Sequence, residues 1–116
     1  MIRRGDIHMV DLEPSRGSEA DKRRPAVIVS IDPANDTARR LGRGVVTVVP
    51  VTSNVARVFP FQVFLPAAST GLDRDSKAQA EQIRSVDVQR IGDLVGVVTG
   101  VSMLELGEAI RVHLGL

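Results

Sequence analysis

Two groups of polar residues in this 116-residue sequence could act on a phosphate. One is the basic triplet Lys22-Arg23-Arg24, which closes a polar run extending from Pro14 to Pro25. The other is the hydroxyl pair Thr52-Ser53, which follows a strongly apolar run. Arginine offers a phosphate two parallel charge-assisted hydrogen bonds, and a threonine hydroxyl can donate to a phosphate oxygen or orient a neighbour. Taken alone, the triplet also fits a solvated surface run, and the hydroxyl pair also fits a helix cap.

Other sets of catalytic residues have less support in the sequence. The two histidines, His8 and His113, could form an acid–base pair, but surface or half-buried imidazoles are the more ordinary interpretation. The sequence has no cysteine, no His/Asp/Glu spacing typical of a metal site, and no glycine motif that presents a catalytic serine or holds a phosphate. We therefore expect neither a metal nor a cofactor. With three Phe and no Trp or Tyr, the sequence also lacks the stacking surfaces of common RNA-binding folds.

Length and composition are those of one globular domain, which we place over residues 1–116. The net charge of +1 does not by itself indicate a nucleic-acid-binding protein, so local clusters of charge must decide. No apolar run is long enough to span a membrane, and no apolar segment follows the basic N-terminus as in a signal peptide. Together with the lack of cysteine, this predicts a cytoplasmic protein.

The strands that must position the polar groups are predicted from apolar and β-branched runs. The run over residues 26–31 is β-branched and continuous, as in a strand that is buried on both faces, and the run over residues 45–51 is the strongest strand signal in the sequence. We predict strands over residues 6–12, 26–31, 45–51, 61–65 and 94–98. Residues 76–83 fit a strand or a helix, and the preceding strands favour a strand.

The connections are predicted from turn-forming residues and helix caps. We predict a turn over residues 32–36, a basic irregular connection over 37–44, a loop over 66–75 and a short helical turn over 85–91. Thr52 or Ser53 could cap a short helix over residues 54–57. Ser102 and Glu105 have the spacing of a capping box and predict the start of an amphipathic C-terminal helix. The sum is a small α+β domain on a partly closed antiparallel barrel or a strongly bent sheet.

Six short motifs, in order and with their spacing kept, resemble the MazF/PemK family of toxin endoribonucleases from type II toxin–antitoxin systems. The resemblance spans essentially the whole chain and looks particularly like the actinobacterial members. One piece alone is weakly specific, whereas six in register are strongly specific. The pieces are Arg4-Gly5-Asp6, Asp11-Leu12-x-Pro14, Gly17-Ser18-Glu19, Arg24-Pro25 with the apolar run behind it, Val49-Pro50-Val51-Thr52-Ser53, and Glu81-Gln82-Ile83-Arg84-Ser85.

The resemblance implies an SH3-like, five-stranded antiparallel barrel of the CcdB/MazF type with a C-terminal helix, in a homodimer. It implies a sequence-specific, metal-independent endoribonuclease that cleaves single-stranded RNA and so inhibits translation and growth. The substrate is mRNA, with rRNA and tRNA as further candidates, and the products are a 2′,3′-cyclic phosphate and a 5′-hydroxyl. The implied partner is a MazE-like antitoxin with an acidic extended tail, which the basic residues around Arg24 make electrostatically sensible.

The resemblance also implies roles for individual residues. The family's catalytic arginine and threonine match Arg24 and Thr52. The predicted RNA contacts are Gly17, Ser18, Glu19, Ser53, Glu81 and Gln82. Because a guanidinium holds its proton far above neutral pH, Arg24 is a poor general base, and Glu19 is a candidate for that role on chemical grounds. Recognition of the RNA sequence is expected in the loops over residues 14–24, 52–60 and 66–76.

Two other functions stay open at this point. Related CcdB proteins share the implied fold but are non-catalytic poisons of DNA gyrase that act through C-terminal residues. The presence of both Arg24 and Thr52 in register argues against that function. The second alternative is an inactive RNA-binding module that has kept the fold. Cleavage of naked RNA with a chelator present separates these functions, because it requires neither gyrase nor a metal.

Overall fold

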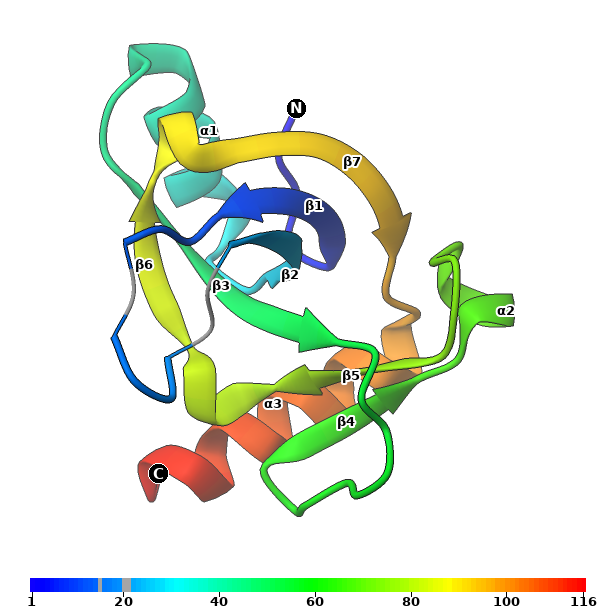
Figure 1. Cartoon of the computed structure of the whole chain (residues 1–116). Helices are drawn as coiled ribbons and strands as arrows, with labels where there is room; N and C mark the ends of the chain where they lie inside the picture. Colours follow the sequence, from blue (N-terminus) through cyan, green and yellow to red (C-terminus); the bar gives the residue numbers. More distant parts are fainter. Residues whose placement is uncertain (15, 20–21) are drawn as a thin grey trace.

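The computed structural model describes residues 1–14, 16–19 and 22–116, and it consists of a strongly bent antiparallel sheet with a long helix at the C-terminal end (Figure 1). Single 3₁₀ turns at Ala80–Gln82 and Val88–Arg90 flank one strand. The strands are β1 Asp6–Asp11, β2 Arg23–Ile28, β3 Val45–Thr52, β4 Gln62–Leu65, β5 Ser76–Gln79, β6 Arg84–Asp87 and β7 Ile91–Val97. The helices are α1 Asp32–Leu41, α2 Ala67–Thr70 and α3 Gly100–Leu114.

Strand β3 organises the sheet. The strand order is β4-β5-β3-β2-β1-β7, and β6 also pairs with β3. The first half of β3 pairs with β6, from Val45 opposite Asp87 to Val48 opposite Arg84. Its end pairs with β5, where Thr52 lies opposite Lys77. The predicted α+β class and barrel-like antiparallel sheet are confirmed, with seven strands in the described residues where five were expected.

The sheet has an apolar core on each face, because successive side chains of a strand point to opposite sides. One core gathers Ile7, Val27, Val49 and Val51 beneath α3, which contributes Leu106 and Ala109. The other core gathers Val10, Ala26, Ile28, Val46 and Val48 and is joined by Ala38 of α1. This arrangement explains why residues 26–31 and 45–51 are continuously apolar. The two helices therefore cover opposite faces of the central strands (Figure 1).

The prediction for residues 32–44 was wrong, because most of this segment forms helix α1. Its Pro33 lies in the first helical turn, where the missing N–H costs nothing and the fixed φ suits the helix. Gly42 ends the helix in a left-handed conformation, with φ of 66°. The basic residues Arg39 and Arg40 lie in the last turn, where cations interact favourably with the helix dipole. Asp32 and Pro33, which were interpreted as part of a turn, form the first turn of this helix.

Three smaller predictions also need correction. Residues 54–57 form no helix; instead the Thr52 hydroxyl accepts a hydrogen bond from the Asn54 N–H at 3.2 Å. The predicted helical turn over 85–91 is strand β6 as far as Asp87, followed by a 3₁₀ turn. The short helix α2 lies within the loop predicted over 66–75.

The C-terminal helix is confirmed, but its cap is not the predicted one. Helix α3 starts at Gly100, so Ser102 lies inside its first turn rather than at the cap. The cap is Thr99, whose Oγ1 accepts a hydrogen bond from the Ser102 N–H at 3.3 Å. The apolar side chains of this helix differ in exposure: Leu106 is buried, whereas Leu114 is about half exposed. Residues 76–79 form the strand favoured from the sequence, β5.

Candidate active site

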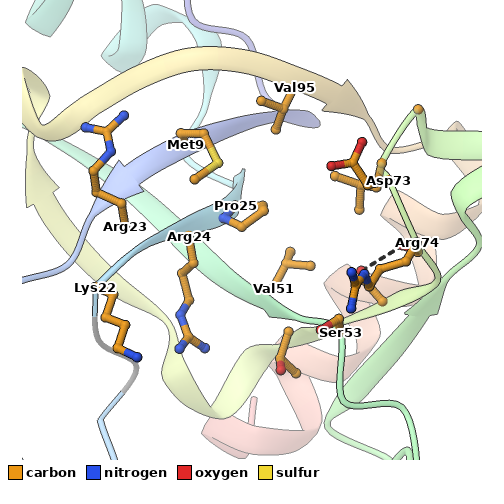
Figure 2. A pocket seen from close by; sticks show the side chains of 14 residues that line it. Met9, Lys22, Arg23, Arg24, Pro25, Val51, Ser53, Asp73, Arg74 and Val95 are labelled. Carbon is orange, nitrogen blue, oxygen red and sulfur yellow. Dashed lines mark hydrogen bonds between the residues drawn. The ribbon is translucent and has the colours of Figure 1, made fainter.

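Arg24 and Thr52 line the same pocket, which has a volume of about 530 Å³ (Figure 2). The pairing of strands β2 and β3 ends with Ala26 opposite Pro50; Arg24 lies two residues before Ala26 and Thr52 two residues after Pro50, so both side chains leave the same end of the paired segment. The expectation that the guanidinium and the hydroxyl meet at one rim is therefore confirmed. Ser53 lines the pocket beside Thr52.

The pocket carries an excess of positive charge. Four of its lining residues are cationic, and one, Asp73, is anionic. The cationic residues are Lys22, Arg23, Arg24 and Arg74. Apolar side chains of Met9, Pro25, Val51, Leu72 and Val95 also line it. Positively charged side chains beside a low-dielectric wall attract a polyanion more strongly than the same charges do in open solvent.

The Thr52 side of the pocket is anchored by a buried lysine. Lys77, which lies opposite Thr52 in the sheet, is only 7% exposed. Its Nζ donates a hydrogen bond of 2.6 Å to the carbonyl of Arg57 and lies 6.0 Å from the centre of the Phe59 ring. These contacts tie down the segment that follows Thr52. The Thr52 Oγ1 accepts the Asn54 N–H, so its own hydrogen can be directed at a bound oxygen.

The Arg24 side is formed by the end of the β1–β2 hairpin. The Leu12 N–H donates to the carbonyl of Lys22 at 3.0 Å, and the Lys22 N–H donates to the Glu13 carboxylate at 2.7 Å. Lys22 has a positive φ of 63°, an uncommon conformation for a residue with a side chain. This kink precedes the pair Arg23 and Arg24, which then enter strand β2. The hairpin thereby delivers three consecutive cations to one end of the pocket.

The first loop and the segment after β5 meet beside the pocket. The Gln82 side-chain amide donates a hydrogen bond of 2.8 Å to the carbonyl of Ser18. The loop itself is a tight turn in which the Glu19 N–H donates to the Arg16 carbonyl and the Glu19 carboxylate accepts the Arg16 N–H at 2.9 Å. Gly17 adopts a left-handed φ of 54° in that turn. The structure thus brings Ser18 and Gln82 together, while Gly17, Ser18 and Glu19 are not among the residues that line the pocket.

Glu81 is directed towards strand β4. One carboxylate oxygen accepts a hydrogen bond of 2.6 Å from the side-chain amide of Gln62. The other oxygen is buried and has no hydrogen-bond partner among the described residues. The sequence placed Glu81 beside Gln82 as an RNA contact, but the two side chains engage different parts of the molecule. A role of Glu81 towards RNA stays a prediction.

The two histidines do not line the pocket with Arg24. His8 is buried, and its Nδ1 lies 2.9 Å from the Gly92 carbonyl, so the hydrogen between them belongs to the ring. Its Nε2 lies 3.8 Å from the Asp6 carboxylate. The ring of His113 lies against Phe61, with the ring centres 6.1 Å apart. Within residues 1–14, 16–19 and 22–116, no group of three His, Asp or Glu side chains could hold a metal ion, and no helix is both long and apolar enough to cross a membrane.

Sequence reasoning missed Asp73 and Arg74 as individual site residues. Both line the pocket from the loop before β5, on the far side from Arg24 (Figure 2). Only the loop as a whole was expected to contribute, because its composition is polar and no motif singles out either residue. The Ala67 N–H donates to the Asp75 carboxylate at 2.9 Å, which closes this loop over α2. The pocket is therefore formed from five separate stretches of the chain.

The bent antiparallel sheet and its basic pocket, which is lined by both Arg24 and Thr52, define a small α+β domain suited to binding a phosphodiester. Residues 3–114 match the model of the family described as "PemK-like, MazF-like toxin of type II toxin-antitoxin system". Endoribonuclease MazF9 of Mycobacterium tuberculosis is 60% identical over 116 residues, which cover 100% of this chain and 98% of that protein. The chain therefore belongs to the PemK/MazF family of toxin endoribonucleases.

Solved structures of family members share this fold. The crystal structure of MazF (Form-I) from Deinococcus radiodurans superposes with a TM-score of 0.81 at 27% identity, covering 98% of this chain and 96% of that one. An endoribonuclease in complex with its cognate antitoxin, from Mycobacterial species, superposes with a TM-score of 0.74 at 24% identity, covering 100% and 97%. These matches give no support to the alternative of a CcdB-like gyrase poison.

Proposed function

We propose that this toxin cleaves single-stranded RNA at a short recognition sequence, without a metal, and that Arg24 and Thr52 are its catalytic residues. The observation that carries the assignment is that both residues line one cationic pocket, at the end of the paired strands β2 and β3. The predicted RNA contacts Ser18, Ser53 and Gln82 lie in or beside it.

The proposed reaction is attack of the ribose 2′-oxygen on the adjacent phosphorus. A bond forms between the 2′-oxygen and phosphorus, the bond from phosphorus to the 5′-oxygen breaks, and the products are a 2′,3′-cyclic phosphate and a 5′-hydroxyl. Negative charge grows on the non-bridging oxygens in the pentavalent state. The Arg24 guanidinium and the Thr52 hydroxyl stabilise that charge, and one such donor contributes about 3–4 kcal/mol. Alignment of the 2′-oxygen with the leaving oxygen supplies a further part of the rate.

The proton of the attacking 2′-hydroxyl needs an acceptor. Glu19 is the candidate on chemical grounds, since a carboxylate can take this proton whereas the Arg24 guanidinium cannot. One Glu19 oxygen accepts the Arg16 N–H, which leaves the second oxygen for the proton. Because Glu19 does not line the pocket, this role requires the turn over residues 16–19 to approach the bound RNA.

Two protein partners belong to the proposal. The first is a MazE-like antitoxin, as in the mycobacterial complex, with an acidic tail that complements the cationic pocket. The second is another copy of this chain. Helix α3 exposes Val101, Leu104 and Val112, and such apolar side chains on one helix are typical of a surface that another subunit covers. Action on cellular RNA places the protein in the cytoplasm.

The test uses the purified protein and a long RNA free of other proteins, which contains many different candidate recognition sequences. EDTA is present throughout. Cleavage that leaves cyclic phosphate and 5′-hydroxyl ends is expected. A matched oligonucleotide with 2′-deoxyribose at the cleavage position is the control, and it is expected to stay intact because the attacking oxygen is missing. Cutting of that control at the normal rate would refute the mechanism. Inhibition of gyrase with RNA left intact would support the CcdB-like alternative.

A further inference from the structure

A second pocket lies directly next to the Arg24–Thr52 pocket and has no role in the reaction described so far. Its volume is about 530 Å³. It is lined by Asp11 and Arg23 from the β1–β2 hairpin, by Asp87 and by residues 89–92. None of these residues was singled out as a site residue from the sequence, apart from Arg23 as part of the basic triplet.

Arg23 connects the two pockets, because it is the residue that lines both. Its side chain points away from Arg24 and Lys22 (Figure 2), as expected for neighbours on a strand. The guanidinium lies over Gly92: a Cβ added there would come within 3.2 Å of Arg23 Nη2 and 3.0 Å of the Met9 carbonyl. Glycine at this position therefore keeps the space for the guanidinium. Within the described residues, the Arg23 side chain has no hydrogen bond or ion pair.

Two carboxylates of the second pocket offer acceptors, and one of them belongs to Asp11, the cross-strand partner of Arg23. Oδ1 of Asp87 accepts the Gln89 N–H at 2.8 Å, and Oδ1 of Asp11 accepts the Glu13 N–H at 3.1 Å. In each carboxylate the second oxygen has no partner within the described residues. Arg90 is already engaged, since its Nη1 donates to the carbonyls of Asp11 and Glu13. The guanidinium of Arg23 thus shares this pocket with two carboxylates that each retain one acceptor.

We propose that this second pocket reads the base of the nucleotide next to the scissile phosphate, and that guanine fits it best. Guanine presents two acceptors, O6 and N7, that suit the guanidinium of Arg23, and N–H donors that suit a carboxylate of Asp87 or Asp11. Sequence-specific reading of single-stranded RNA uses such base edges once the base is unstacked. The carboxylates disfavour a bound phosphate, so the pocket takes a base rather than a backbone group. This inference rests on the proposed cleavage of RNA.

The experiment compares cleavage profiles of the wild-type protein and of Asp87→Asn on an RNA pool randomised around the cut, with the ends mapped by sequencing. Asparagine keeps an oxygen for the Gln89 N–H, so the fold is retained, but it loses the negative acceptor. We expect the wild type to prefer guanine at one position beside the cut. Asp87→Asn should reduce that preference by about tenfold, because cleavage of sequences with guanine at this position becomes slower, with the preferences at the other positions unchanged. Asp11→Asn serves as a second variant, and Asp36→Asn, on the exposed side of α1, as the matched control.

Each other outcome overturns a distinct claim. If the wild type cuts RNA and the profile is the same in both pocket variants, the base-reading pocket is refuted while the proposed function stands. An equal loss on all sequences, or a loss confined to antitoxin binding with the RNA profile unchanged, also refutes it. If the wild type does not cut RNA at all, it is the proposed function that fails.

Discussion

The two sides of the Arg24–Thr52 pocket are held in place by different means. On the hairpin side, the hydrogen bonds of Glu13 and Lys22 lie at the protein surface. On the other side, Thr52 ends the most deeply embedded strand, and the segment after it is fixed by the buried Lys77. The hairpin side therefore supplies positive charge to the pocket, and the β3–β5 side holds Thr52 in a fixed position. The comparison suggests that substitutions on the first side act mainly on the reaction, and substitutions on the second side also act on the fold.

The largest effect is expected from Arg24→Ala, which removes the donor assigned to the transition-state charge. We expect kcat to fall by about 10²–10³-fold, with the melting temperature nearly unchanged. Single-turnover cleavage of an RNA oligonucleotide measures the first, and thermal unfolding measures the second. Arg40→Ala, an exposed arginine of α1, is the control for loss of one positive charge. An Arg24→Ala protein with wild-type kcat would remove this residue from the mechanism.

A somewhat smaller effect is expected from Thr52→Val, which replaces the hydroxyl with a methyl group of similar size. The expected loss in kcat is about 10–10²-fold, because a neutral donor stabilises an anion less than a guanidinium does. Thr52→Ser keeps the hydroxyl and should recover most of the rate. Equal rates for the valine and serine variants would show that the hydroxyl does not participate.

The sharpest comparison of the two sides is Lys77→Met against Lys22→Met. Loss of the buried ammonium leaves the Arg57 carbonyl without its donor, so we expect Lys77→Met to lower the free energy of unfolding by about 1–3 kcal/mol. It should also reduce kcat severalfold, since Thr52 loses its support. Lys22 is exposed, and its substitution should change stability by less than about 0.5 kcal/mol. Urea unfolding of both variants measures the difference; equal stabilities would contradict the contrast between the two sides.

The smallest effect is expected from Glu19→Gln, about tenfold or less in kcat. Glutamine keeps an oxygen for the Arg16 N–H, so the turn is retained, but it cannot take up the 2′ proton. Single-turnover cleavage of the same RNA oligonucleotide measures this loss. A loss of about a hundredfold or more would make Glu19 the principal base. An unchanged rate would exclude it.

Much of the site could be predicted from the sequence, because its two central residues lie at the ends of strands that the sequence predicts. The valine-rich runs of β2 and β3 indicate buried neighbours, and their ends bring Arg24 and Thr52 to one rim. Helix α1 was missed because Asp32 and Pro33 suit both a turn and a helix start, and packing of Ala38 and Asn35 decides between them. The orientation of Glu81 was missed because it depends on Gln62, which comes from a different strand.

The second pocket shows why composition alone is insufficient. Its walls come from the hairpin and from residues that follow β6, and no short motif links Arg23 to Asp87. Gly92 could have been noticed only as a glycine inside an apolar strand, which marks close approach of another group. What approaches it, the Arg23 guanidinium, depends on the pairing of β1 with both β2 and β7.

The double pairing of β3 has a consequence for how the molecule opens. Strands β6, β2 and β5 together pair with every residue of β3 from Val45 to Thr52, so we expect its amide protons to exchange with deuterated solvent only when the sheet opens widely. Strands β4 and β7, at the two ends of the strand order, can separate without this wide opening. Thr52 is the last residue of β3, which we expect to be the last strand to separate from the sheet. Partial opening of β4 or β7 therefore leaves the backbone of Thr52 in its place.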